Sequence, residues 1–147
     1  MSEIARHTQV TASADQAFAY LSDISNHSEW AEQKLEVTRV DSGPVTVGSK
    51  WETVGHLFGK QPATVTIKEL VPNQEITYES DGPVGFFRHS FHMEPSQGES
   101  MMLTKTVDFV DVRSLPLKLL GPVVRSYLAP RGLEGDLKRI KAKLEGA

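Results

Sequence analysis

The C-terminal segment of this 147-residue chain most constrains its fold, because apolar residues recur there at helical spacing. Residues 115–144 predict one long amphipathic helix, with bends near Pro122 and Pro130, where proline removes a backbone hydrogen bond. A second stripe in its first half gives this helix more apolar surface than packing on a sheet requires. The main stripe is Leu117, Leu120, Val124, Leu128, Leu133, Leu137, Ile140 and Leu144, and the second is Leu119, Val123 and Tyr127.

The rest of the sequence predicts strands that are separated by short turns rich in Gly, Pro, Asn and Asp. The expected strands are residues 3–10, 35–40, 50–58, 63–70, 75–80, 86–94 and 101–110. Connections this short favour hairpins, and therefore an antiparallel meander. Two short helices follow the first strand, with N-caps expected at Ser13, which has Gln16 three residues later, and at Asn26, which has Glu29.

These two helices are too short to form a core of their own, so we expect them to close one end of the sheet. Their large apolar side chains, Phe18, Leu21 and Trp30, are then predicted to be buried and structural.

Length and composition predict one domain over residues 1–147, with the 39% hydrophobic and 24% charged content of a soluble globular protein. The net charge of -3 gives no general attraction to nucleic acid. The mildly basic C-terminal helix admits at most a weak contact with a membrane surface. Without a signal peptide or a transmembrane run, we expect a cytoplasmic location, as a monomer or homodimer.

Several kinds of site are excluded by residue type or spacing. Because the sequence has no cysteine, disulfides and thiolate chemistry are ruled out. His89 and His92 are three apart on a predicted strand, hence on opposite faces, so no metal site is expected. No glycine-rich phosphate loop is present, and we therefore expect no cofactor.

The predicted order is a strand, two short helices, six strands and a long helix. Together with the segment 12–23, Trp30, Gly48 and the hairpin carrying Phe91, Met93, Pro95 and Gly98, this order resembles the START-like helix-grip superfamily, in its polyketide cyclase/dehydrase and lipid-transfer branch. The resemblance implies an α+β fold, in which a curved antiparallel sheet of about seven strands wraps around the C-terminal helix. It also implies a cavity for an apolar or aromatic ligand, and no shared catalytic residues. The Pro130–Gly132 segment departs from an uninterrupted helix and leaves that end of the cavity undefined.

A long helix across a curved sheet can leave a hollow that binds a small molecule. Strand alternation places the odd-numbered apolar residues of the last hairpin toward the helix. The resemblance favours Trp51 and Leu57 as the inward residues of their own strand. The expected ligand-binding set is therefore Trp51, Leu57, Phe91, Met93, Met101, Leu103, Val107, Val124, Tyr127 and Leu128.

Two polar residues, His89 and Lys105, share this inward face of the hairpin. A three-residue loop would pair Met93 with Met101 and His89 with Lys105, so that burial and mutual repulsion lower the pKa of both groups. With Tyr127 as a further proton donor, they are the candidate catalytic residues. The alternative is structural: a bulge turns Lys105 to solvent, and His89 is a core histidine bonded to a carbonyl or a water.

Three functions are consistent with these features. The first is a carrier or sensor that holds a small apolar or aromatic ligand such as a lipid or polyketide. The second is a cyclase or dehydratase that uses the same cavity, so the sequence leaves enzymatic activity open. The third is a protein-interaction module in which the basic helix face contacts a partner.

Overall fold

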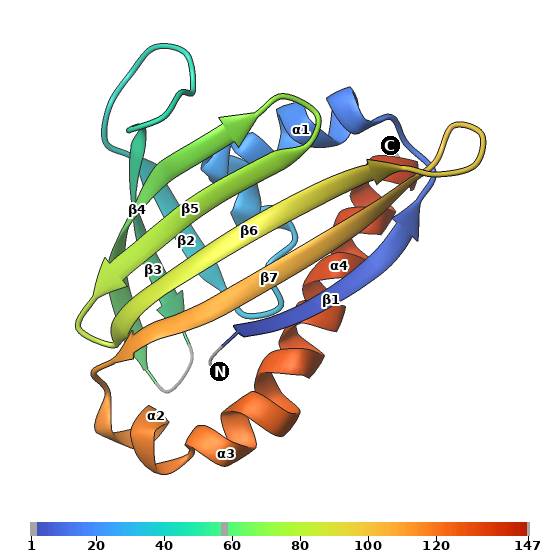
Figure 1. Cartoon of the computed structure of the whole chain (residues 1–147). Helices are drawn as coiled ribbons and strands as arrows, with labels where there is room; N and C mark the ends of the chain where they lie inside the picture. The colour runs from blue at the N-terminus through green and yellow to red at the C-terminus, as the bar shows by residue number, and fades with distance from the viewer. Residues whose placement is uncertain (1–2, 57–58, 147) are drawn as a thin grey trace.

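The computed structural model describes residues 3–56 and 59–146, which form a curved seven-stranded antiparallel sheet with helices on one side (Figure 1). The sheet order is β1-β7-β6-β5-β4-β3-β2, so β2 to β7 form the predicted meander and β1 pairs with β7. The strands are β1 (Glu3–Val10), β2 (Leu35–Arg39), β3 (Lys50–His56), β4 (Lys60–Val71), β5 (Glu75–Gly82), β6 (Gly85–Pro95) and β7 (Met101–Val112).

Two short helices, α1 (Ala14–Ser22) and η1 (Ile24–Glu29), follow β1 as predicted. Ser13 is the N-cap of α1, and its Oγ accepts a hydrogen bond from the Gln16 N–H at 3.3 Å. The predicted cap of the second helix, Asn26, is wrong. Asp23 caps this 3₁₀ helix instead, because its carboxylate reaches the Ser25 N–H at 3.0 Å.

The helix predicted over 115–144 is divided into α2 (Leu115–Leu119), α3 (Gly121–Val123), a π-helical turn η2 (Val124–Leu128) and α4 (Ala129–Gly146). Pro122 lies in the first turn of α3, where its missing N–H costs nothing. Before Pro130 the chain widens, and the Ala129 N–H donates to the Val124 carbonyl five residues back. This turn accommodates the proline ring, so α4 continues unbroken through residues 130–132.

The hydrophobic core lies between the sheet and these helices. Helix α4 packs along β1 and β7, while α1 packs against β5 and β6. The α4 stripe of Leu133, Leu137, Ile140 and Leu144 is buried as predicted. Of the three residues expected to close the end of the sheet, Leu21 and Trp30 are fully buried, and Phe18 is partly buried against the core.

Candidate functional site

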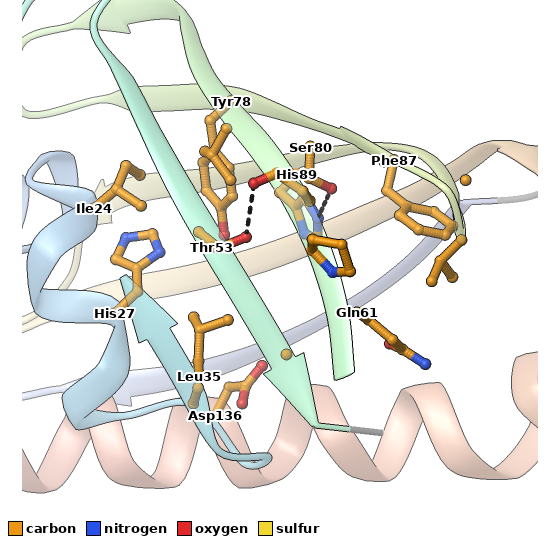
Figure 2. Close-up of a pocket in the computed structure, with 18 of the residues that line it drawn as sticks. Ile24, His27, Leu35, Thr53, Gln61, Tyr78, Ser80, Phe87, His89 and Asp136 are labelled. Atoms are coloured by element: carbon orange, nitrogen blue, oxygen red, sulfur yellow. Dashed lines mark hydrogen bonds between the residues drawn. The ribbon is translucent and has the colours of Figure 1, made fainter. Parts of the chain in front are cut away.

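A pocket of about 250 Å³ lies between the sheet, η1 and α4, toward the end of the sheet where β4 and β6 begin and β5 ends (Figure 2). Apolar side chains and backbone form much of its wall, and a group of polar side chains forms the remainder. The apolar lining includes Trp30, Ala63 and Phe87, and the polar lining includes His27, Tyr78, Ser80, His89, Lys105 and Asp136.

A buried ion pair joins the sheet to the C-terminal helix at this pocket. The side chain of Lys105, on β7, is 5% exposed, and its Nζ lies 3.7 Å from Asp136 Oδ2 on α4. The other carboxylate oxygen, Asp136 Oδ1, accepts a hydrogen bond from the Glu32 N–H at 2.7 Å. The Lys105 ammonium also lies 5.6 Å from the Trp30 ring centroid and 5.5 Å from that of Phe91. The Trp30 and Phe91 rings therefore help to stabilise the buried ammonium of Lys105.

Burial shifts the two members of this pair toward their neutral forms. It lowers the pKa of Lys105, against the opposing effect of Asp136, and it raises the pKa of Asp136, against the opposing effect of Lys105. Lys105 therefore releases its proton more readily than it would at the surface, and Asp136 accepts a proton more readily.

Two histidines are held neutral at the same site. His27 is 2% exposed, its Nε2–H donates to the Leu21 carbonyl at 3.0 Å, and burial lowers its pKa to about 3. His89 Nε2 lies 3.5 Å from Ser80 Oγ, and its Nδ1 is buried without a partner in the part of the chain that the structure describes. Burial, and then the charge of Lys105, lowers the pKa of His89 well below its usual value.

Tyr78 connects these groups through its ring. The ring stacks on the His89 imidazole at a centroid distance of 4.8 Å, and it meets His27 edge-on at 5.2 Å. Burial, and then the charge of Asp136, raise the pKa of Tyr78, so it remains a neutral phenol. The site thus presents a phenol and two neutral imidazoles (Figure 2), beside the amine–carboxylate pair of Lys105 and Asp136.

The predicted register of the last hairpin is wrong by two residues. Met93 pairs with Leu103, Phe91 with Lys105, and His89 with Val107. The connection is longer than three residues: the Ser96 N–H donates to the Ser100 carbonyl at 2.9 Å. Because a shift of two preserves the faces of a strand, His89 and Lys105 still lie on the inner face, and both line the pocket.

The expected ligand-binding set occupies other places. Its members on β3, β6 and β7 are buried in the hydrophobic core, Val124 is half-buried, Tyr127 and Leu128 are exposed on η2, and Leu57 lies outside the described residues. None of its described members is among the residues that line the pocket. The core members are Trp51, Phe91, Met93, Met101, Leu103 and Val107. They pack into a solid interior, whereas the hollow forms near the hairpin ends, where smaller side chains leave space.

Sequence reasoning missed the other polar residues of the site, although three of them carry a signal. Asp136 follows Leu133 by three and precedes Ile140 by four, which places it on the buried stripe of α4. Tyr78 alternates with the buried Ile76 on β5. His27 precedes the buried Trp30 by three on the inward side of η1.

Residues 1–145 match the sequence model of the family described as polyketide cyclase / dehydrase and lipid transport. The chain belongs to this family. A search of curated protein sequences gives no match.

Solved structures of low sequence identity share the fold of this chain. A START superfamily protein from Mycobacterium smegmatis superposes with a TM-score of 0.77 at 16% identity, covering 97% of this chain and 96% of that one. A protein from Thermus thermophilus gives 0.78 at 15% identity, with 97% and 96% coverage. The Zhui aromatase/cyclase from Streptomyces sp. R1128 gives 0.71 at 18% identity, with 97% and 92% coverage. The chain therefore has the predicted helix-grip fold.

Proposed function

We propose that this family member binds one small, ring-containing apolar molecule in the pocket, with an oxygen substituent directed at the Lys105–Asp136 pair. The observation that supports this most is the composition of the wall, where a buried amine–carboxylate pair adjoins apolar surface. Pockets for small molecules usually combine a mostly apolar lining with a few placed polar groups.

The volume of the pocket limits the size of its ligand. An engineered cavity of about 150 Å³ holds benzene. The pocket here, at about 250 Å³, fits one or two fused rings, and it is too small for a lipid with two acyl chains. An aromatic or cyclised polyketide fragment satisfies both the size and the polarity of the site.

The direct test is native mass spectrometry of the purified protein, followed by binding of 1-naphthol as a two-ring probe. We expect a co-purified small molecule or a naphthol complex, either of which raises the melting temperature.

The paired substitution Lys105→Met with Asp136→Leu removes both charges together, so that neither is left buried alone. It should weaken binding of naphthol more than binding of naphthalene, which lacks the oxygen. Equal losses for both probes would contradict the assigned role of the pair.

A second candidate function, dehydration or cyclisation of the bound molecule, is favoured by the neutral state of His89. A neutral imidazole accepts a proton from the carbon beside a ketone, and the enolate oxygen that forms is stabilised by the Lys105 ammonium. When the enolate reforms its carbonyl with a new carbon–carbon double bond, the protonated His89 returns the proton to the departing hydroxyl, which leaves as water.

This second function predicts turnover of a β-hydroxyketone that is lost in His89→Ala. His89→Phe preserves the stacking on Tyr78 and serves as the matched control for packing. Loss of turnover in both variants, with naphthol binding retained, supports catalysis by His89. Full turnover in either variant removes His89 from the mechanism and leaves the binding function intact.

A further inference from the structure

The segment from α2 to η2 carries an apolar surface that the fold leaves uncovered. No residue of α2, α3 or η2 is buried. Large apolar side chains are exposed along its whole length, from 39% at Leu120 to 73% at Leu119. We call this surface the docking face, and it consists of Leu115, Leu119, Leu120, Val123, Tyr127 and Leu128.

The charge of this segment is opposite to that of the whole chain. Between residues 114 and 133 the charged side chains are Lys118, Arg125 and Arg131, and no Asp or Glu occurs there, whereas the chain as a whole carries -3. Within the described residues none of the three forms an ion pair, although Arg131 lies over the Tyr127 ring at 5.0 Å. The neighbouring Arg113 is neutralised by Asp81 and Asp111. The docking face is thus bordered by three cations available to an anionic partner.

The docking face begins beside the pocket. The N–H groups of Arg113 and Ser114 both donate to the Val84 carbonyl at 2.9 Å, and Val84 lines the pocket. In Figure 1 the segment lies beyond the end of the sheet, at the base of α4. Among the described helices none is both long and apolar enough to cross a membrane, so such a segment can contact a bilayer only from its surface.

We propose that the docking face binds the surface of an anionic lipid bilayer. The exposed leucines, Val123 and Tyr127 enter the boundary between headgroups and acyl chains, while the three cations contact lipid phosphates. Charge argues against a second copy of this chain as the occupant, because a two-fold interface would set a surface with three cations and no anion against an identical surface. Binding there would bring the pocket next to the membrane, where apolar molecules accumulate.

The test is co-sedimentation of the full chain with vesicles of equal parts phosphatidylglycerol and phosphatidylcholine, compared with phosphatidylcholine alone. We expect binding to the anionic vesicles that weakens as salt is added, since electrostatic attraction is screened. Leu119→Glu should reduce this binding by about tenfold or more, because it replaces an inserted apolar group by an anion. Lys118→Ala should reduce it by roughly fivefold.

The matched control is Val47→Glu, which places the same charge at another exposed apolar residue (56% exposed), distant in sequence from the docking face. It should bind vesicles as the wild type does. The proposal is overturned if wild-type protein stays in the supernatant with anionic vesicles, or if Leu119→Glu and Val47→Glu bind equally. It is also overturned if sedimentation velocity shows a dimer that Leu119→Glu dissociates, or if naphthol alone protects residues 115–128 from hydrogen exchange.

Discussion

At the scale of single residues, Trp30 combines a structural position with a place in the pocket wall. It is 3% exposed, it meets Phe91 edge-to-face at 5.7 Å, and its Nε1 has no hydrogen-bond partner among the described residues. Truncating a buried aromatic costs about 3–5 kcal/mol, so Trp30→Ala should lower the melting temperature by roughly 10 °C. Trp30→Phe keeps a ring and removes the unpaired N–H, so it should lower the melting temperature much less than Trp30→Ala does. Thermal unfolding followed by circular dichroism measures both, and equal shifts would contradict the packing role.

The buried His27 makes stability depend on pH. Its pKa is about 3 in the folded chain, against the ordinary value of 6.5 that applies when the chain unfolds. The unfolded chain therefore takes up the proton first, and the free energy of unfolding should fall as the pH drops from about 6.5 toward 3. The pKa difference of His27 alone should change the free energy of unfolding by several kcal/mol over this pH range, because each pKa unit corresponds to about 1.4 kcal/mol.

His27→Gln removes this titration while retaining an N–H donor for the Leu21 carbonyl. In urea unfolding between pH 7 and pH 4, the variant should lose less stability than the wild type. Parallel pH profiles for the two proteins would show that His27 is not buried in its neutral form.

At the scale of secondary-structure elements, equal apolar periodicity leads to opposite burial in the two parts of the C-terminal helix. Leu137 on α4 is 3% exposed, whereas Leu119 on α2 is 73% exposed. Leu137→Ala should therefore cost about 2–5 kcal/mol of unfolding free energy, and Leu119→Ala should fall within about 0.5 kcal/mol of wild type. Chemical denaturation of both variants makes the comparison, and a large cost at Leu119 would mean that α2 packs against the protein in solution.

The contrast between Leu137 and Leu119 shows which features of the fold could be predicted from the sequence. Strand alternation and turn residues located all seven strands, since both depend on local backbone chemistry. Periodicity shows that a face is apolar, but what covers that face depends on where the sheet ends. Strand alternation likewise shows that Met93 and Leu103 point inward, but it does not show whether a hollow lies beside them. Both residues are buried in the core. The hollow is lined by residues of several strands, η1 and α4, and no local pattern records how these segments come together.

Polar residues of the site could be predicted only where the signal lay within one hairpin. His89 and Lys105 were found because they interrupt an apolar alternation within one hairpin. Asp136 comes from a helix 31 residues later in the chain, and its pairing with Lys105 depends on the packing of α4 against the sheet. The register of the hairpin failed because a Gly-containing loop can close over three residues or over five, and the apolar pairs fit both.

At the scale of the whole molecule, the volume of the pocket should decide which ligands stabilise the fold. A ligand that binds only the folded chain stabilises it by about 2.7 kcal/mol at a concentration of 100 times its Kd, which for a chain of this size raises the melting temperature by several degrees. We expect such a rise with 1-naphthol and none with a two-chain phospholipid dispersed below its vesicle-forming concentration. Ala63→Trp places a large ring in the pocket and should abolish the response to naphthol, whereas Thr38→Trp, at an exposed position on β2, should retain it. If Ala63→Trp and Thr38→Trp respond alike while both remain folded, naphthol binds elsewhere, and the pocket between the sheet and α4 is not the ligand site.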